Sequence, residues 1–148
     1  MLEEVLSKLS GYIDSVPAGF NRLTQDELMH KPAPGKWSKK EILGHLIDSA
    51  INNLKRFTEV QFLPQPYTVI RYRQDDLVQV NKYQQLPLEN LLQLWSSLNK
   101  QIVSVIENIP PEKLIYTVVI PNGESRDLAF LITDYADHLV HHLKQVFA

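Results

Sequence analysis

The sequence predicts an all-α fold, a four-helix bundle with a long crossover between its second and third helices. Four stretches repeat apolar residues at helical spacing, whereas only residues 116–120 have the β-branched character of a strand. The chain has 148 residues, of which 44% are hydrophobic and 22% are charged, as is usual for globular proteins. This length is enough for one ordinary core, so we expect a single domain over residues 1–148.

The first helix is predicted from the start of the chain, because apolar residues return there every three or four positions. They are Leu2, Val5, Leu6, Leu9, Tyr12, Ile13 and Val16. Pro17 is expected to close this helix, since proline removes a backbone donor and clashes with the preceding turn. Residues 24–27 form a capping-box pattern that could open a short helical turn. Residues 31–36 contain two prolines and a glycine, which predicts a loop.

The second helix is predicted at about residues 39–62, because Ser38 and Glu41 form a second capping box in front of an apolar stripe. Pro64 and Pro66 should end it. Residues 63–86 then form the crossover. A connection of this length is usually functional or partly helical.

The third helix should begin near Pro87, because proline suits the first turn of a helix. A continuous apolar stripe follows, made of Leu88, Leu91, Leu92, Trp95, Leu98, Ile102, Val105, Ile106 and Ile109. Pro110 and Pro111 stop it. Residues 116–120 are expected as an extended segment or a small hairpin, because an isolated strand would be unusual in a helical domain. Ser125 is the predicted N-cap of the fourth helix, at about residues 126–147.

Composition and charge exclude several functions. Fifteen basic and seventeen acidic residues give a net charge of −2 without a lysine or arginine cluster, which argues against nucleic acid as a partner. The absence of cysteine excludes disulfides and thiolate metal sites, so any nucleophilic thiol must come from a substrate. No apolar stretch approaches the roughly 20 residues of a membrane span, and residues 1–4 do not resemble a signal peptide. We therefore expect a cytoplasmic protein that does not bind membranes.

Three histidines are the main candidates for a functional site. His138 and His142 are four residues apart on the fourth helix, so they share one face, about 6 Å apart along the axis. That face is apolar, and an unpaired polar group buried there would cost about 1–3 kcal/mol. A divalent metal bound by these two residues and His45 would satisfy them and leave a coordination position open for chemistry. The three can meet only if the second and fourth helices run antiparallel.

Each histidine also has an ordinary alternative as a hydrogen-bonded core residue. His141 is expected at the edge of the site or in solvent, and nothing recommends His30. Asp48, one turn after His45, could orient an imidazole or act as a catalytic base, or it could be a solvated carboxylate. Asp134 could do the same from the other helix.

Other residues are assigned by their position relative to His45. Asn52 and Arg56 continue its face and are predicted to bind substrate. The guanidinium of Arg56 suits an anionic group, although it could instead pair with a crossover carboxylate, Asp75 or Asp76. Trp37 is expected as a core plug at the end of the bundle rather than as a substrate-stacking residue. Tyr72 and Arg73 are assigned as pocket-wall residues on position alone.

These residues resemble a known family, the DinB/YfiT-like metal-binding bundles. The resemblance is carried by Trp37-Ser38, Glu41, His45-Leu46-Ile47-Asp48-Ser49, Asn52, Arg56-Phe57 and the run from Tyr135 to His142. It covers most of the chain, and the segment from Lys31 to Phe57 looks especially like the YfiT branch. It implies a four-helix bundle with a divalent metal, zinc or nickel, on His45, His138 and His142. Some branches have a further histidine where this chain has Gln145, so that position is not a ligand of the same kind.

The resemblance implies metal-dependent hydrolysis, or transfer to or from a low-molecular-weight thiol, for a small-molecule substrate. An open metal position would serve either reaction, and the sequence does not separate them. The alternatives are a non-catalytic stress-response module that binds a ligand or a metal, and a bundle without metal. Bundles of this kind often form homodimers, and the sequence gives no decisive interface signal.

Overall fold

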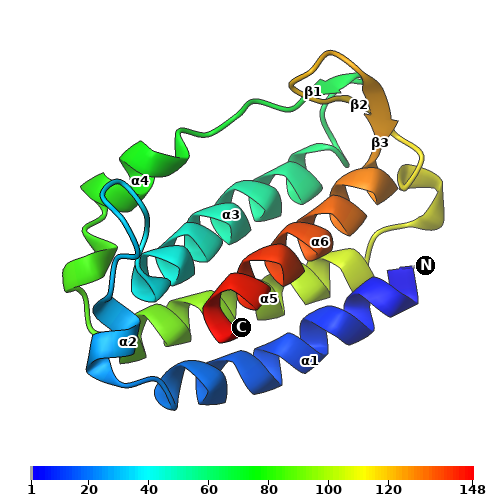
Figure 1. Ribbon diagram of the computed structural model, residues 1–148. Coiled ribbons are helices and arrows are strands. Elements are labelled where there is room, and N and C mark those ends of the chain that lie inside the picture. Colours follow the sequence, from blue (N-terminus) through cyan, green and yellow to red (C-terminus); the bar gives the residue numbers. More distant parts are fainter. Residues whose placement is uncertain (1) are drawn as a thin grey trace.

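Four long helices form the body of the protein in a computed structural model that describes residues 2–148 (Figure 1). They are α1 (Leu2–Asn21), α3 (Lys39–Glu59), α5 (Leu88–Glu107) and α6 (Leu128–Phe147). Around the bundle, α1 packs on α5, α5 on α3, α3 on α6, and α6 on α1. The predicted four-helix bundle is therefore confirmed. Within residues 2–148, every helix is too short or too polar to cross a membrane.

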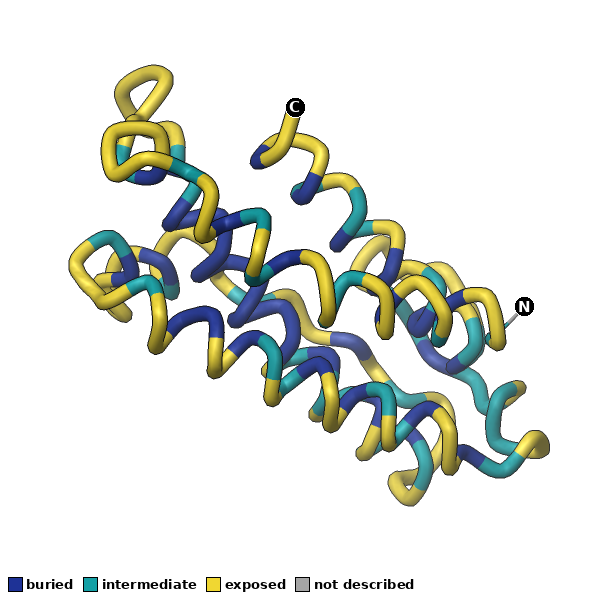
Figure 2. Tube along the Cα trace, turned by 90° about the horizontal axis from the view of Figure 1, so that it is seen from below, coloured by how far each residue is buried: buried dark blue, intermediate teal, exposed yellow. Residues whose placement is uncertain are grey.

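The bundle is held together by the apolar faces of its helices, which point inward (Figure 2). Phe20 of α1, Ile47 of α3, Trp95 of α5 and Ile132 of α6 are each completely inaccessible to solvent. Together with the other buried apolar residues they form one cluster. Removal of this surface from water is the main force that aligns the helices.

The expected end of the first helix is wrong. Pro17 lies inside α1, which continues to Asn21. Proline in a helix interior loses a backbone hydrogen bond and costs about 3 kcal/mol in an isolated helix. Here Val16 and Phe20 on either side of it are buried in the core. Their packing offsets that cost, so tertiary contacts override the local signal.

Both capping boxes are confirmed, and they begin two helices. Thr24 caps the short helix α2 (Gln25–Met29) and Ser38 caps α3, in each case through the backbone N–H three residues later. Helix α3 ends at Glu59, slightly before the predicted residue 62. Tight turns continue the chain from there to Leu63.

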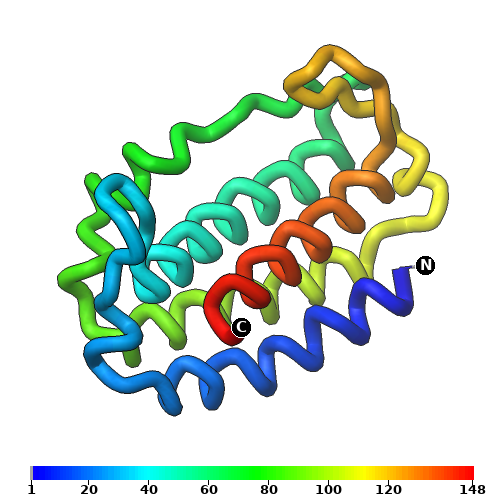
Figure 3. Tube along the Cα trace, in the orientation of Figure 1, coloured from blue at the N-terminus to red at the C-terminus, as the bar shows by residue number. Residues whose placement is uncertain are grey.

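The crossover is partly helical, as expected. It contains strand β1 (Tyr67–Thr68), helix α4 (Gln74–Val80) and a 3₁₀ turn, η1 (Tyr83–Gln85), and it runs along α3 before α5 begins (Figure 3). Its last part is fixed to α3 by Tyr83, whose ring lies directly over Gly44. The Tyr83 hydroxyl donates to Asp48 Oδ1 at 2.6 Å. Gln84 Nε2 donates to the carbonyl of Met29 at 3.0 Å.

A small sheet covers one end of the bundle (Figure 1). The predicted hairpin is present, as β2 (Thr117–Val119) pairs antiparallel with β3 (Ser125–Asp127), and Val118 lies opposite Arg126. Strand β1 of the crossover adds a parallel partner to β2, which the sequence did not indicate. Ser125 is not the N-cap of α6, because it belongs to β3. Asp127 caps α6 instead, by accepting from Phe130 N at 2.9 Å.

A short 3₁₀ turn, η2 (Pro111–Lys113), lies between α5 and β2. Helix α5 ends at Glu107, just before the two prolines that were expected to stop it. Helices α3 and α6 lie side by side and run in opposite directions, which brings residues near the start of α3 beside the last turns of α6 (Figure 1).

Candidate metal centre

Three imidazoles from α3 and α6 meet at the contact between these helices. His45 Nε2 lies 3.2 Å from His138 Nε2, and His138 Nε2 lies 3.1 Å from His142 Nε2. One ring nitrogen of each residue falls within 4.8 Å of the others. The predicted antiparallel arrangement of the two helices produces this convergence, because His45 comes early in α3 and the other two come late in α6.

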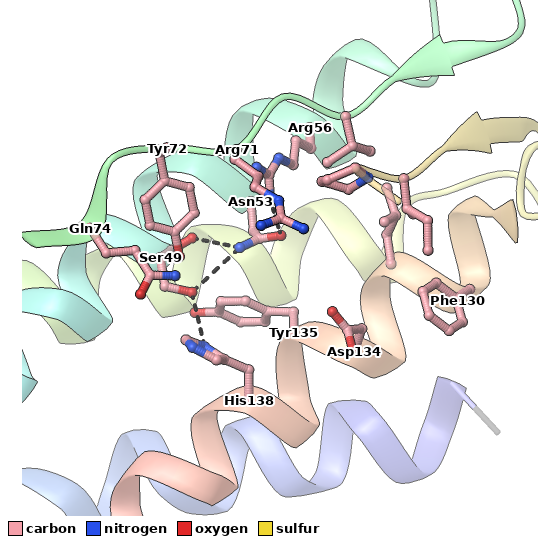
Figure 4. A pocket seen from close by; sticks show the side chains of 14 residues that line it. Ser49, Asn53, Arg56, Arg71, Tyr72, Gln74, Phe130, Asp134, Tyr135 and His138 are labelled. Atoms are coloured by element: carbon pink, nitrogen blue, oxygen red, sulfur yellow. Dashed lines mark hydrogen bonds between the residues drawn. The ribbon is translucent and has the colours of Figure 1, made fainter. Parts of the chain in front are cut away.

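Hydrogen bonds to the outer ring nitrogens orient two of these imidazoles. Gln145 Oε1 lies 2.9 Å from His142 Nδ1. Ser49 Oγ lies 3.5 Å from His138 Nδ1, as Figure 4 shows. An amide oxygen only accepts, so His142 carries its proton on Nδ1 and has a lone pair on Nε2. The Ser49 hydroxyl can accept from His138 Nδ1 in the same way. Both Nε2 lone pairs then face the centre of the cluster.

Electrostatics keep the cluster neutral. Burial, with the neighbouring imidazoles, lowers the pKa of His45 to about 3 and that of His138 to about 4. Burial also lowers the pKa of His142, and the hydrogen bond that His142 donates to Gln145 opposes this effect. All three residues are therefore unprotonated near neutral pH, which is the form that ligates metals.

A divalent cation fits this donor set. Tetrahedral coordination with metal–nitrogen distances of about 2.0–2.1 Å places ligand nitrogens about 3.3 Å apart. The two shortest separations in the cluster, 3.1 and 3.2 Å, are close to this value. Neutral nitrogens whose lone pairs point at one another repel. A cation between them would remove this repulsion by accepting a bond from each of the three nitrogens. Three protein nitrogens also leave a fourth position open.

Asp48 is buried beside the cluster, with 3% of its surface exposed. Its Oδ1 accepts from Tyr83, while its Oδ2 has no hydrogen-bond partner among residues 2–148. Nor does His45 Nδ1, one helical turn earlier, have a partner within that range. Burial raises the pKa of Asp48, and the Tyr83 hydrogen bond opposes this effect. Asp48 is therefore a buried carboxylate, not a solvated one, and one of its oxygens has no hydrogen-bond partner among residues 2–148.

Trp37 packs partly against the core, as expected, but it also forms a wall of the histidine cluster. Its ring centroid lies 4.7 Å from that of His45 and 6.5 Å from that of His142. Trp37 therefore contributes both to the core and to the wall of the histidine cluster.

A cavity of about 330 Å³ opens beside His138 (Figure 4). Polar side chains line it from α3, from the crossover and from α6. They are Ser49, Asn53, Arg56, Arg71, Tyr72, Gln74, Asp134 and His138. Apolar residues, among them Val69, Ile120 and Leu131, complete the wall. This volume is within the range of small-molecule pockets.

A second cavity, of about 600 Å³, adjoins the other side of the cluster. It is lined by His142, Gln145 and Trp37. Lys36, in the loop before α3, and Lys39, the first residue of α3, also line it. The two cavities have no lining residue in common. The histidine cluster is therefore reached from two separate spaces.

The structure places the remaining predicted residues unevenly. Tyr72 lines the first cavity, whereas Arg73 is exposed and pairs with Asp76 at 2.6 Å, so Arg73 as a wall residue is wrong. Asn52 donates to the carbonyl of Asp48 at 2.8 Å and lines a separate hollow with Arg56, outside the cavity that His138 lines. Its predicted contact with substrate remains a prediction.

Arg56 does not pair with Asp75 or Asp76. Its Nη2 donates instead to the carbonyl of Ile70 at 2.6 Å, and its guanidinium lies over Tyr72, 5.5 Å from the ring centroid. His141 and His30 lie outside the three-histidine cluster.

The sequence did not indicate several residues of the site, among them Tyr83, which holds Asp48. Ser49 and Asn53 follow His45 by four and eight positions, and Gln145 follows His142 by three, so helical spacing could have found them. Arg71 lies in the crossover, where periodicity gives no signal.

The fold and the site define a class of protein: a four-helix bundle with a three-histidine cluster suited to a divalent metal. The chain belongs to the DinB superfamily, whose family model matches residues 9–146. The predicted resemblance to the DinB/YfiT-like bundles is confirmed.

Curated relatives from two bacteria match nearly all of this chain. One from Bacillus mycoides is 26% identical in an alignment 148 residues long that covers 97% of this chain and 84% of the relative. One from Oceanobacillus iheyensis is 23% identical over 145 residues, which cover 98% and 83%. Both relatives carry the name "Putative metal-dependent hydrolase".

Solved structures show the same fold. YfiT from Bacillus subtilis, described as a probable metal-dependent hydrolase, superposes with a TM-score of 0.87 at 16% identity, over 97% of this chain and 82% of YfiT. A mycothiol-dependent maleylpyruvate isomerase superposes with a TM-score of 0.73 at 12% identity, and the match covers 97% of this chain but 60% of the isomerase. At these identities the likeness concerns the fold alone.

Proposed function

We propose that this protein is an enzyme that acts on a small molecule through a divalent metal held by His45, His138 and His142. The observation that carries the proposal is the convergence of three neutral imidazoles, with Nε2 separations of 3.1 and 3.2 Å, at the junction of two cavities. Imidazole donors suit zinc and nickel among the available metals, and we propose one of these. Such a metal supplies Lewis acidity and lowers the pKa of water or a thiol enough to make a nucleophile near neutral pH.

The protein's own residues prepare the site for this chemistry. Ser49 and Gln145 hold the His138 and His142 rings with their Nε2 atoms turned inward. We propose Asp48, one helical turn after His45, as a base for the nucleophile, because its buried Oδ2 has no hydrogen-bond partner among residues 2–148. Tyr83 fixes the other oxygen of this carboxylate, and burial raises the pKa of Tyr83, so its hydroxyl remains a donor.

Hydrolysis is the first form of the proposed activity, because two relatives that span most of this chain carry a hydrolase name. Thiol transfer is the second, and a specific observation favours it: the cluster is bordered by two cavities with no lining residue in common. Hydrolysis needs one organic molecule and water, whereas transfer to or from a thiol needs two organic molecules. The chain contains no cysteine, so a low-molecular-weight thiol would have to supply the sulfur.

Metal content after purification without a histidine tag tests the site. We expect about one divalent ion per chain in the wild type and in His141→Ala, and a loss of stoichiometric metal in His142→Ala. His141 is a matched control, because it is the neighbouring histidine on α6 and lies outside the cluster. Full metal in His142→Ala would show that the ligand assignment is wrong.

Activity assays on metal-loaded protein separate the reactions. A panel of esters and amides tests hydrolysis, and a panel of electrophiles with bacillithiol, mycothiol or glutathione tests thiol transfer. Turnover that depends on an added thiol supports the second form. A protein that binds metal but turns over neither panel would favour a non-catalytic binding module instead.

A further inference from the structure

Arg56 is a half-buried cation on α3. Its guanidinium enters the cavity that His138 lines (Figure 4). Two contacts to neutral acceptors hold it, the 2.6 Å bond from Nη2 to the carbonyl of Ile70 and a longer one of 3.5 Å from Nη1 to Asn53 Oδ1. The ion pairs found among residues 2–148 all involve other side chains. Arg56 therefore carries its charge into the cavity without a contacting carboxylate.

Partial burial makes this charge less favourable than a solvated one. It takes water from the guanidinium and lowers the pKa of Arg56, while Tyr72, Tyr67 and the Asp134 carboxylate act in the opposite direction. A guanidinium has five N–H donors, and the two contacts above use a minority of them. The remaining donors form a planar fork that matches the two oxygens of a carboxylate.

Arg71 adds a second cation to the same cavity. It comes from the crossover, whereas Arg56 comes from α3, and Figure 4 shows their side chains meeting at one end of the space. Asp134, exposed at the rim, is the carboxylate among the lining residues. Two arginines and one aspartate leave the wall with one net positive charge. Ser49 and Tyr135 lie between the arginines and His138, whereas Phe130 lies away from His138 (Figure 4). Apolar residues, among them Val69, Ile120 and Leu131, complete the lining.

We propose that this cavity is a carboxylate subsite, in which Arg56 and Arg71 bind the anionic group of a small organic acid with an apolar body. Small organic acids would then be the substrate class of the metal site proposed above. The reaction of the acid depends on that proposed function, whereas its binding to the arginines does not. The acid group would lie at the arginine end, and the rest of the molecule would extend past Ser49 and the Tyr135 ring toward His138. The arginines would thus select the substrate and set its direction.

Geometry favours a carboxylate as the anion. The planar fork of a guanidinium pairs with the two oxygens of a carboxylate. A divalent metal at the histidine cluster would add positive charge to this cavity, so a phosphate ester is the rival anion, and the titrations below separate the two.

Calorimetric titration with benzoate, compared with its neutral isostere benzamide, tests the subsite in metal-loaded protein. We expect benzoate to bind and benzamide to bind at least tenfold more weakly. Arg56→Gln should lower benzoate affinity at least tenfold, and Arg71→Gln at least threefold. Arg73→Gln is the matched control, because it removes the same charge from the same segment outside the cavity. It should keep wild-type affinity.

Several results would overturn the subsite. They are equal affinity for benzoate and benzamide, an equal loss of affinity in Arg73→Gln, and phosphate binding that depends on Arg56 without benzoate binding. Loss of benzoate binding on chelation together with full binding in Arg56→Gln would assign the anion to the metal instead. Arg71→Gln keeps the test valid if Arg56→Gln misfolds, because Arg71 is exposed. If metal-loaded protein does not bind benzoate, the subsite is refuted and the proposed function is not. If the protein binds benzoate but cannot bind metal, the proposed function is refuted and the subsite is not.

Discussion

Acidification of the metal-free protein should reveal the buried neutral imidazole of His45. Burial and its two neighbouring histidines lower the pKa of His45 from 6.5 to about 3. Between these values the unfolded chain binds a proton at this residue and the native state does not. The free energy of unfolding therefore falls as the pH falls below about 6.5, and this loss continues to about pH 3.

The magnitude follows from the width of that pH interval. Each pH unit in which only the unfolded chain is protonated removes about 1.4 kcal/mol. From an unfolded pKa of 6.5 down to pH 5, His45 alone should remove about 2 kcal/mol of stability. Asp48 acts in the opposite direction, because its raised pKa stabilises the native state as the pH falls. The total for the wild type therefore does not isolate His45.

A comparison of variants does isolate it. Urea unfolding of chelator-treated protein is measured at pH 7 and pH 5 for the wild type, for His45→Gln and for His141→Gln as a control. The loss between the two pH values should be about 2 kcal/mol smaller in His45→Gln than in the wild type. It should change much less in His141→Gln, because His141 acts on the cluster only by lowering the pKa values of His138 and His142. Any constant cost of the substitution cancels in this difference. Equal losses in all three proteins would refute the assignment of His45 as a buried neutral imidazole.

Three further predictions concern the metal, the buried carboxylate and the crossover. Zinc or nickel at a hundredfold excess over its Kd should raise the free energy of unfolding by about 2.7 kcal/mol, while the metal-free protein stays folded at room temperature; complete unfolding in chelator would contradict the second part. Asp48→Asn should keep near-stoichiometric metal by elemental analysis but lose at least tenfold in turnover at saturating metal; unchanged turnover would remove Asp48 from the chemistry. Gly44→Ala should cost about 1–3 kcal/mol in urea unfolding, because a Cβ there would lie 2.2 Å from Tyr83 Cδ2, whereas Gly11→Ala, with nothing within 4 Å, should stabilise the protein slightly; equal effects would show that Tyr83 moves aside freely.

Most helices could be predicted from sequence patterns that act over a few neighbouring residues. Ser38 and Thr24 cap helices as predicted, because a capping box satisfies donors only three residues away. The facing of His138 and His142 is also local, since helical geometry alone sets it. The sequence thus determined the bundle, the starts of α2 and α3 and two thirds of the histidine cluster.

Tertiary structure decided the features that depend on distant parts of the chain. Pro17 remains inside α1 because Val16 and Phe20 find a core to pack against, which no local pattern records. Strand β1 forms because the crossover returns beside β2, a pairing between segments about fifty residues apart. The approach of His45 to the α6 histidines likewise depends on the antiparallel packing of two helices.

The cavity beside His138 is the clearest product of packing. Arg56 lies on a helix face that the sequence could identify, but its partner was misjudged, because the path of the crossover places the Ile70 carbonyl and not Asp75 within its reach. Arg71 lies in an irregular segment, where side-chain direction follows from the fold and not from periodicity. The sequence by itself determined which residues can carry the chemistry, whereas only the tertiary structure decided which of them share a space, because loop paths and helix contacts are set by the burial of the whole core.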